Sequence, residues 1–113
     1  MRTPKRPKLT APADEMRHIA AMLERELVRW PDVSVRPMFG MRAFYRGTTV
    51  FAMLPDKRAL GSPRAIGYKL PSGANRREGE KWRLFELESA QDIGRALWHL
   101  DRAYRKAVSR KSR

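Results

Sequence analysis

The sequence predicts an α+β domain in which two helices pack on one face of a mainly antiparallel sheet of about five strands. Apolar residues at three- and four-residue steps indicate a helix near each end of the chain, and short β-branched and aromatic runs fill the middle. The order helix, strands, helix is typical of helices that share one sheet face. A chain of 113 residues has the length of one domain.

The first helix is predicted to start after Ala13 and to end at or before Trp30, because Pro31 disfavours helical backbone in the residue before it. Asp14 and Glu15 suit the positive end of the helix dipole. The apolar face of this helix is expected to carry Met16, Ile19, Ala20, Leu23, Leu27 and Trp30.

The predicted strands are short segments bounded by turn-forming residues. They cover residues 33–36, 42–46, 48–54, 66–70 and 81–87. Gly47 is the expected hairpin turn between the second and third strands, since glycine accepts the positive φ of tight turns. Residues 71–80 are predicted to be the longest internal loop, because they are polar and rich in turn formers.

The last helix has the strongest helical pattern. Ser89 is its expected N-cap, and Asp92 stands three residues later, in the capping-box position. Arg105 and Lys106 lie in its final turns, where cations suit the negative end of the dipole. Its apolar face is expected to carry Ile93, Ala96, Leu97, Leu100, Ala103, Tyr104 and Ala107.

Positive charge is concentrated at both ends of the chain. The first twelve and last twelve positions hold ten of the 25 Lys and Arg residues and no Asp or Glu, within a formal net charge of +13. We therefore expect a disordered basic arm at residues 1–12, one domain at 13–108 and a basic tail at 109–113. Such segments attract polyanions, such as nucleic acid or an anionic membrane surface. The residues expected to contact nucleic acid are Arg2, Lys5, Arg6, Lys8, Arg105, Lys106, Arg110, Lys111 and Arg113.

Several classes of chemistry find no pattern in the sequence. The absence of cysteine excludes disulfides and thiolate sites, and neither Gly-rich phosphate loops nor a nucleophile elbow is present. His18 and His99 have no second ligand at metal-site spacing, so we expect them to be structural or exposed. No apolar run approaches the ~20 residues of a membrane span. The sequence thus favours a cytoplasmic, non-enzymatic protein without metal, cofactor or membrane contact.

One internal segment mixes cations with aromatic side chains at the edge of a predicted hairpin. Such a mixture can hold an anion or stack on a base. The alternative is that its apolar residues fill the core and its arginines are solvated. The three tryptophans, Trp30, Trp82 and Trp98, are also expected in the core. The candidate ligand-binding residues are Arg36, Met38, Phe39, Arg42 and Tyr45.

The same segment resembles a known family. An Arg at 36, Met-Phe-Gly at 38–40, a Tyr at 45, Gly47 and the apolar strand that follows resemble the TfoX N-terminal-domain family, although Met41 stands where that family commonly has a second glycine. Residues 82–89 and the helix after them are similar to small bacterial luciferase-family domains. Both resemblances, and the related MmcQ/YjbR-like proteins, imply a compact α+β fold. The TfoX resemblance also implies a regulatory domain linked to competence or transcription.

Two functional hypotheses follow. The first is a small non-enzymatic regulatory or interaction domain that contacts nucleic acid through its basic arms, with backbone-directed and weakly sequence-dependent binding. The second is a small-ligand-binding or enzymatic domain with an anion or aromatic site at residues 36–45. Homodimerisation through a strand edge or the second helix stays open. Arg42→Ala is expected to abolish ligand binding under the second hypothesis and to trim nucleic-acid affinity under the first.

Overall fold

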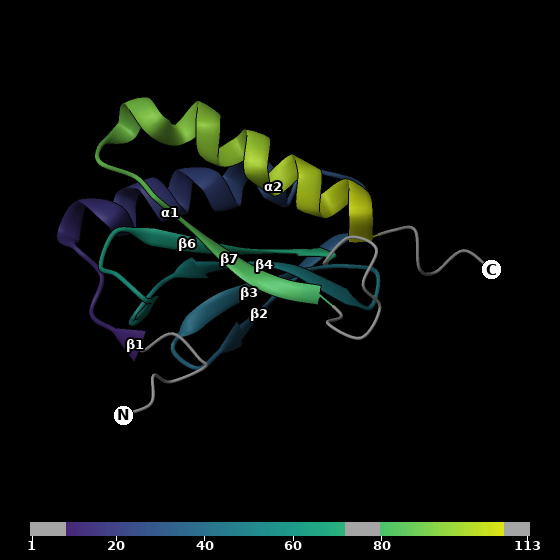
Figure 1. Cartoon of the computed structure of the whole chain (residues 1–113), viewed down its shortest axis with the longest axis horizontal. Coiled ribbons are helices and arrows are strands. Elements are labelled where there is room, and N and C mark those ends of the chain that lie inside the picture. The colour runs from purple at the N-terminus through teal and green to yellow at the C-terminus, as the bar shows by residue number, and fades with distance from the viewer. Residues whose placement is uncertain (1–8, 72–79, 108–113) are drawn as a thin grey trace.

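A five-stranded antiparallel sheet with two helices on one face forms the body of the protein, which confirms the predicted fold class (Figure 1). The computed structural model describes residues 9–71 and 80–107. The strand order is β2-β3-β4-β6-β7. Each strand lies within two residues of its predicted bounds at either end: β2 Val33–Met38, β3 Met41–Arg46, β4 Thr49–Pro55, β6 Ala65–Pro71 and β7 Glu80–Glu86.

Helix α1 spans Asp14–Leu27 and ends three residues before Trp30, the latest end that the sequence allowed. The backbone N–H of Trp30 donates to the carbonyl of Leu27 at 3.0 Å, which closes the chain into a turn after the helix. The chain then enters β2 through Asp32, whose φ of 66° lies in the left-handed region. Asp residues tolerate this conformation better than most side chains.

Helix α2 spans Ile93–Ala107, after a short 3-10 helix, η1, at Ala90–Asp92. The expected cap is present, because the Ser89 hydroxyl oxygen accepts from the Gln91 N–H at 3.2 Å. The Asp92 carboxylate accepts from the N–H of Glu88 at 2.8 Å, one residue earlier than a capping box would place it. The 3-10 helix η1 follows directly after Ser89, and in this geometry the Asp92 side chain accepts from the Glu88 N–H and not from the Ser89 N–H of a capping box.

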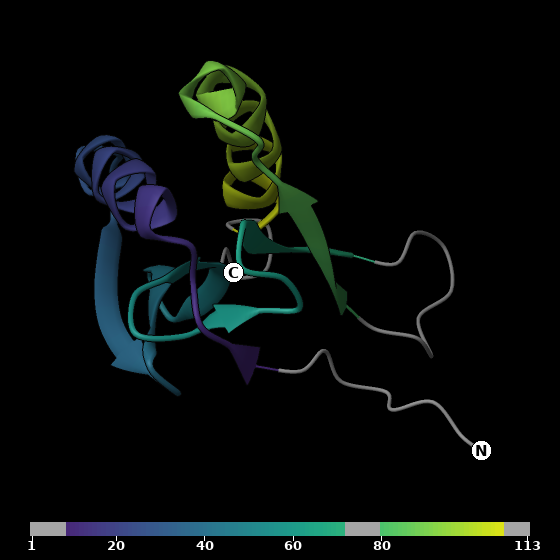
Figure 2. The same cartoon turned by 90° about the vertical axis from the view of Figure 1, so that its left-hand side faces the viewer.

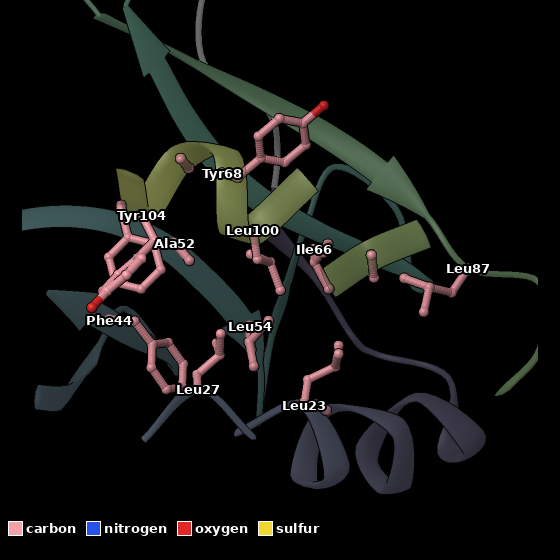
Figure 3. Packing of buried hydrophobic residues seen from close by; sticks show 14 of the residues in the cluster. Leu23, Leu27, Phe44, Ala52, Leu54, Ile66, Tyr68, Leu87, Leu100 and Tyr104 are labelled. Atoms are coloured by element: carbon pink, nitrogen blue, oxygen red, sulfur yellow. The ribbon is translucent and has the colours of Figure 1, made fainter. Parts of the chain in front are cut away.

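The main core lies between the helices and the sheet (Figures 2 and 3). An irregularity between Phe44 and Tyr45 gives β4 one extra residue, so Phe51 and Ala52 both belong to this core. The largest fully buried side chains of the cluster are Met16, Ile19, Leu23, Leu27, Phe44, Phe51, Leu54, Ile66, Leu87 and Leu100. The cluster also buries Ala20, Ala96, Ala103, Tyr104 and Ala107. The other three predicted apolar positions of the helices, Trp30, Ile93 and Leu97, are partly buried against it.

A second, two-stranded sheet was not expected from the sequence. Strand β1, Leu9–Thr10, pairs antiparallel with β5, Ala59–Leu60, and β1 lies on the side of the main sheet away from the helices (Figure 2). Residues 9 and 10, which the sequence placed in a disordered arm at 1–12, therefore form a strand instead. Two-residue strands carry no periodicity, and this pairing depends on a distant segment of the chain. Residues 1–8 and the predicted tail at 109–113 lie outside the described residues.

The three tryptophans differ in burial, although all three were predicted to lie in the core. Trp30 and Trp82 are half-buried, but Trp98 on α2 is 58% exposed, so its expected place in the core is wrong. The helical spacing that suggested burial runs through Leu97 and Leu100, on a neighbouring face of the same helix. In residues 9–71 and 80–107, no helix is long and apolar enough to cross a membrane.

Candidate functional site

The five predicted ligand-binding residues lie on one hairpin but do not converge. Strands β2 and β3 pair from Val33 to Arg46 around a two-residue turn of Phe39 and Gly40. Successive strand residues face opposite sides of the sheet. Arg36, Met38 and Tyr45 face away from the helices, Arg42 faces α1, and Phe39 stands at the turn.

Arg42 is occupied by a partner on α1. Its Nη2 lies 2.7 Å from Oε2 of Glu24, and its Nε donates to Oε1 of the same carboxylate at 3.1 Å. The hydrogen bond with Glu24 raises the pKa of Arg42 above its ordinary value, against a smaller lowering by burial. The arginine thus cross-links β3 to α1, which removes it from the predicted ligand site.

The sheet face that points away from the helices carries two pairs of a cation and an aromatic ring. The guanidinium carbon of Arg36 lies 5.4 Å from the ring centre of Tyr45, and Nζ of Lys69 lies 5.6 Å from that of Trp82. Both distances fall within the range of cation–π attraction. We call this surface the open sheet face. Its residues are Ser34, Arg36, Met38, Tyr45, Val50, Lys69, Trp82 and Leu84.

A small apolar cluster lies beneath the side chains of the open sheet face. Met41, Ala43 and Met53 are buried, and Tyr45 and Trp82 pack against them from the rim. A Cβ added at Gly67 would lie 3.0 Å from Leu60 and 3.4 Å from the Trp82 ring, so the missing side chain makes room for both. Leu60 of β5 packs on the same cluster and covers part of this face. Tyr45 and Trp82 remain half-exposed.

Only two of the nine predicted nucleic-acid-binding residues fall within the described residues. Arg105 donates to the Asp101 carboxylate at 2.9 Å, one helical turn earlier on α2. Lys106 is exposed at the same helix end. The other seven lie outside the described residues: Arg2, Lys5, Arg6, Lys8, Arg110, Lys111 and Arg113.

Arg46 holds the end of α2 against the sheet. Its Nη1 donates to the carbonyl of Tyr104 at 3.0 Å, and its guanidinium carbon lies 3.8 Å from the centre of the Tyr104 ring. The Tyr104 hydroxyl donates to the carbonyl of Pro31 at 2.8 Å. These contacts fix α2 to both β3 and the segment after α1, which is a structural role.

His99 is half-buried in an aromatic cluster between α2 and the β6–β7 edge of the sheet. Its ring stacks on Tyr68 at a centre-to-centre distance of 4.9 Å and contacts Phe85 at 4.8 Å. Burial lowers the pKa of His99 below its ordinary value of 6.5, and the nearby charges of Arg102 and Arg95 lower it further. This imidazole therefore acts as an aromatic packing residue, as expected.

Sequence reasoning missed residues both of the open sheet face and of the surface around Phe39. Trp82 was assigned to the core, yet the register that pairs it with Lys69 places both on the open sheet face. Lys57 and Arg58 were not singled out, although they line an open hollow beside Phe39. An alternating pattern in residues 81–87 could have separated Trp82 from Phe85. No local pattern marks the two cations.

In the part of the chain that the structure describes, no group of three or more His, Asp or Glu side chains lies close enough to hold a metal ion. Comparison with known proteins gave no match: neither a protein-family model, a curated protein nor a solved structure is similar to this chain.

Proposed function

We propose that the protein is a small non-enzymatic domain that binds nucleic acid through the open sheet face and the basic segments beside it. The observation that carries the proposal is the pair of cation–aromatic contacts, Arg36 with Tyr45 and Lys69 with Trp82, on a sheet face that no helix covers. An aromatic ring offers a stacking surface to a base, and the cation held against the ring supplies positive charge for a phosphate.

The geometry favours a single strand over a duplex. Both aromatic rings lie on the open sheet face, and unpaired bases can stack on exposed aromatic side chains of this kind. Stacking of one base on an aromatic side chain is worth about 1–3 kcal/mol and tolerates every base. We therefore infer weak sequence preference, with phosphate contacts providing much of the affinity.

The cations of the two chain ends belong to the same proposal. Residues 1–8 lie outside the described chain, which begins with Leu9 of β1 on the same side of the sheet as the open sheet face. If the cations of the face and of both ends engage about five phosphates of a single strand, log affinity falls with log salt at a slope of about −3.5.

The family resemblance belongs to the same proposal. The motif at residues 36–47 forms the β2–β3 hairpin, and the α+β order of elements agrees with the fold that a TfoX N-terminal-like domain implies. A regulatory or interaction role in the cytoplasm, exerted on nucleic acid, fits both. Membership in that family is supported by these features alone.

Fluorescence anisotropy of a labelled, mixed-sequence single-stranded DNA tests the proposal. The full chain is titrated at two salt concentrations, and a chain without residues 1–8 and 109–113 is titrated in parallel. We expect saturable binding that weakens steeply with salt, and residual, less salt-dependent binding by the shortened chain. A full chain that fails to bind at low salt would overturn the proposal.

A further inference from the structure

The β2–β3 turn holds an aromatic residue in an unfavourable backbone conformation. Met38 pairs with Met41, so the loop has two residues, and both have positive φ: 53° for Phe39 and 79° for Gly40. This combination defines a type I′ turn, which strongly prefers Asn, Asp or Gly at its first position. A bulky residue there stores local strain.

The Phe39 side chain gains no burial that would offset the strain. It is 71% exposed, the largest exposed fraction among the exposed large hydrophobic residues of the described chain. Neither of the two apolar clusters found in residues 9–71 and 80–107 includes it. Strain and exposure together are typical of residues kept for binding.

Two cations are fixed beside this ring by the backbone. The N–H groups of Lys57 and Arg58 both donate to the carbonyl of Gly40, at 2.8 and 2.9 Å. The side chain of Arg58 packs on Gly40 so closely that an added Cβ would meet its Cγ at 2.6 Å. The turn after β4 is thus locked onto the β2–β3 turn, and its two cations stand next to Phe39.

The two turns border a wide-open surface hollow of about 690 Å³, lined by Ala11, Phe39, Gly40, Lys57 and Arg58. This volume is in the usual range for small-molecule sites. Asp56 precedes the two cations, so the turn has two positive charges against one negative charge. The hollow therefore combines a stacking face with a net positive rim.

We propose that this hollow binds a small aromatic anion, with the planar ring of the ligand on Phe39 and its charged group between Lys57 and Arg58. The site lies at the end of β3 opposite Tyr45 and shares no residue with the open sheet face. It is therefore a second site, independent of the proposed nucleic-acid surface. Nucleotides and aromatic carboxylates both have the required chemistry.

Isothermal titration of the full chain with AMP and with 4-hydroxybenzoate tests the proposal. It also distinguishes the two ligand classes, nucleotides and aromatic carboxylates. Adenosine lacks the charge and ribose 5-phosphate lacks the ring, so we expect each to bind at least about fivefold more weakly than AMP. Saturable binding of AMP or of 4-hydroxybenzoate supports the site and identifies the class. Absence of saturable binding by both overturns it.

Substitutions at the turn separate function from folding. Phe39→Asn supplies the preferred residue of a type I′ turn, so we expect a higher melting temperature together with at least about fivefold weaker ligand binding. Phe39→Tyr keeps the ring and the affinity. Lys57→Gln weakens binding, whereas Arg29→Gln in the turn after α1, the matched charge control, does not. Unchanged affinity in Phe39→Asn, or a lower melting temperature, contradicts the proposal.

Discussion

Arg42 and Glu24, eighteen positions apart in the sequence, join strand β3 to helix α1 through two hydrogen bonds of 3.1 and 2.7 Å. The paired geometry matches the planar guanidinium to both carboxylate oxygens, which is the strongest form of such a contact. Both side chains are only partly exposed, so solvent screens the pair less than a surface ion pair. Arg42 is therefore a residue of the fold.

A double-mutant cycle measures this pair. Glu24→Gln, Arg42→Gln and the double variant are expected to give a coupling free energy of about 1 kcal/mol in urea unfolding, since partly buried, bidentate pairs exceed the usual surface value. Arg42→Gln should leave single-stranded DNA affinity within about twofold of the unaltered protein. A coupling energy near zero, or a large loss of DNA affinity, would indicate that Arg42 is a binding residue and not a structural one.

Arg36 provides the matching test on the open sheet face. Arg36→Gln is expected to weaken single-stranded DNA binding and to make the salt slope about 1 unit less steep, because one phosphate contact is lost. Arg29→Gln removes the same charge from an exposed position in the turn after α1. Equal effects of the two substitutions would mean that only net charge matters, in which case the sheet face has no specific role.

Two glycines are predicted to respond in opposite directions to the same substitution. Gly40→Ala places a Cβ at 2.6 Å from Arg58 in a backbone with a φ of 79°, so we expect a loss of about 1–3 kcal/mol in the free energy of unfolding. Gly94→Ala meets nothing within 4 Å on α2 and should add up to about 1 kcal/mol. Denaturant unfolding of both variants checks the pair, and a stabilised Gly40→Ala variant would refute the turn geometry.

His99 makes stability depend on pH in a stated direction. Because burial and two arginines lower its pKa below 6.5 in the folded protein, the unfolded chain binds more protons. Its contribution to the free energy of unfolding is therefore fully present above pH 6.5 and is lost as the pH falls from there through the folded pKa.

One variant isolates this effect from other titrating groups. His99→Gln should flatten the pH dependence of the unfolding midpoint below pH 6.5 relative to the unaltered protein. Urea midpoints across that window give the comparison. Identical curves for the variant and the unaltered protein would show that the His99 environment does not govern the effect.

The sequence predicted the fold well because its signals are local. The apolar spacing of α1 and α2, the glycine at the Gly47 turn and the Ser89 cap each depend on residues within a few positions of one another. The register of a strand follows from its alternating pattern and its turns. Strands β1 and β5 escaped prediction because only their mutual pairing defines them.

The candidate site was less predictable, because the side of the sheet to which each side chain points depends on the three-dimensional structure. The segment of residues 36–45 was identified as a mixture of cations and aromatics, yet the sheet sends Arg42 to one side and Tyr45 to the other. Glu24, the partner that decides the role of Arg42, lies in another element. Trp98 shows the same limit, since its exposure depends on how α2 rotates over the sheet.

The central claim is that nucleic acid lies on the open sheet face, and amide chemical-shift mapping of the isotope-labelled full chain with single-stranded DNA tests it most directly. The account predicts that the largest shifts fall on the Tyr45 amide, the Val50 amide and the Trp82 indole, with little change on the outer surface of α1. Shifts confined to the helices, or to the chain ends without the sheet, would contradict it.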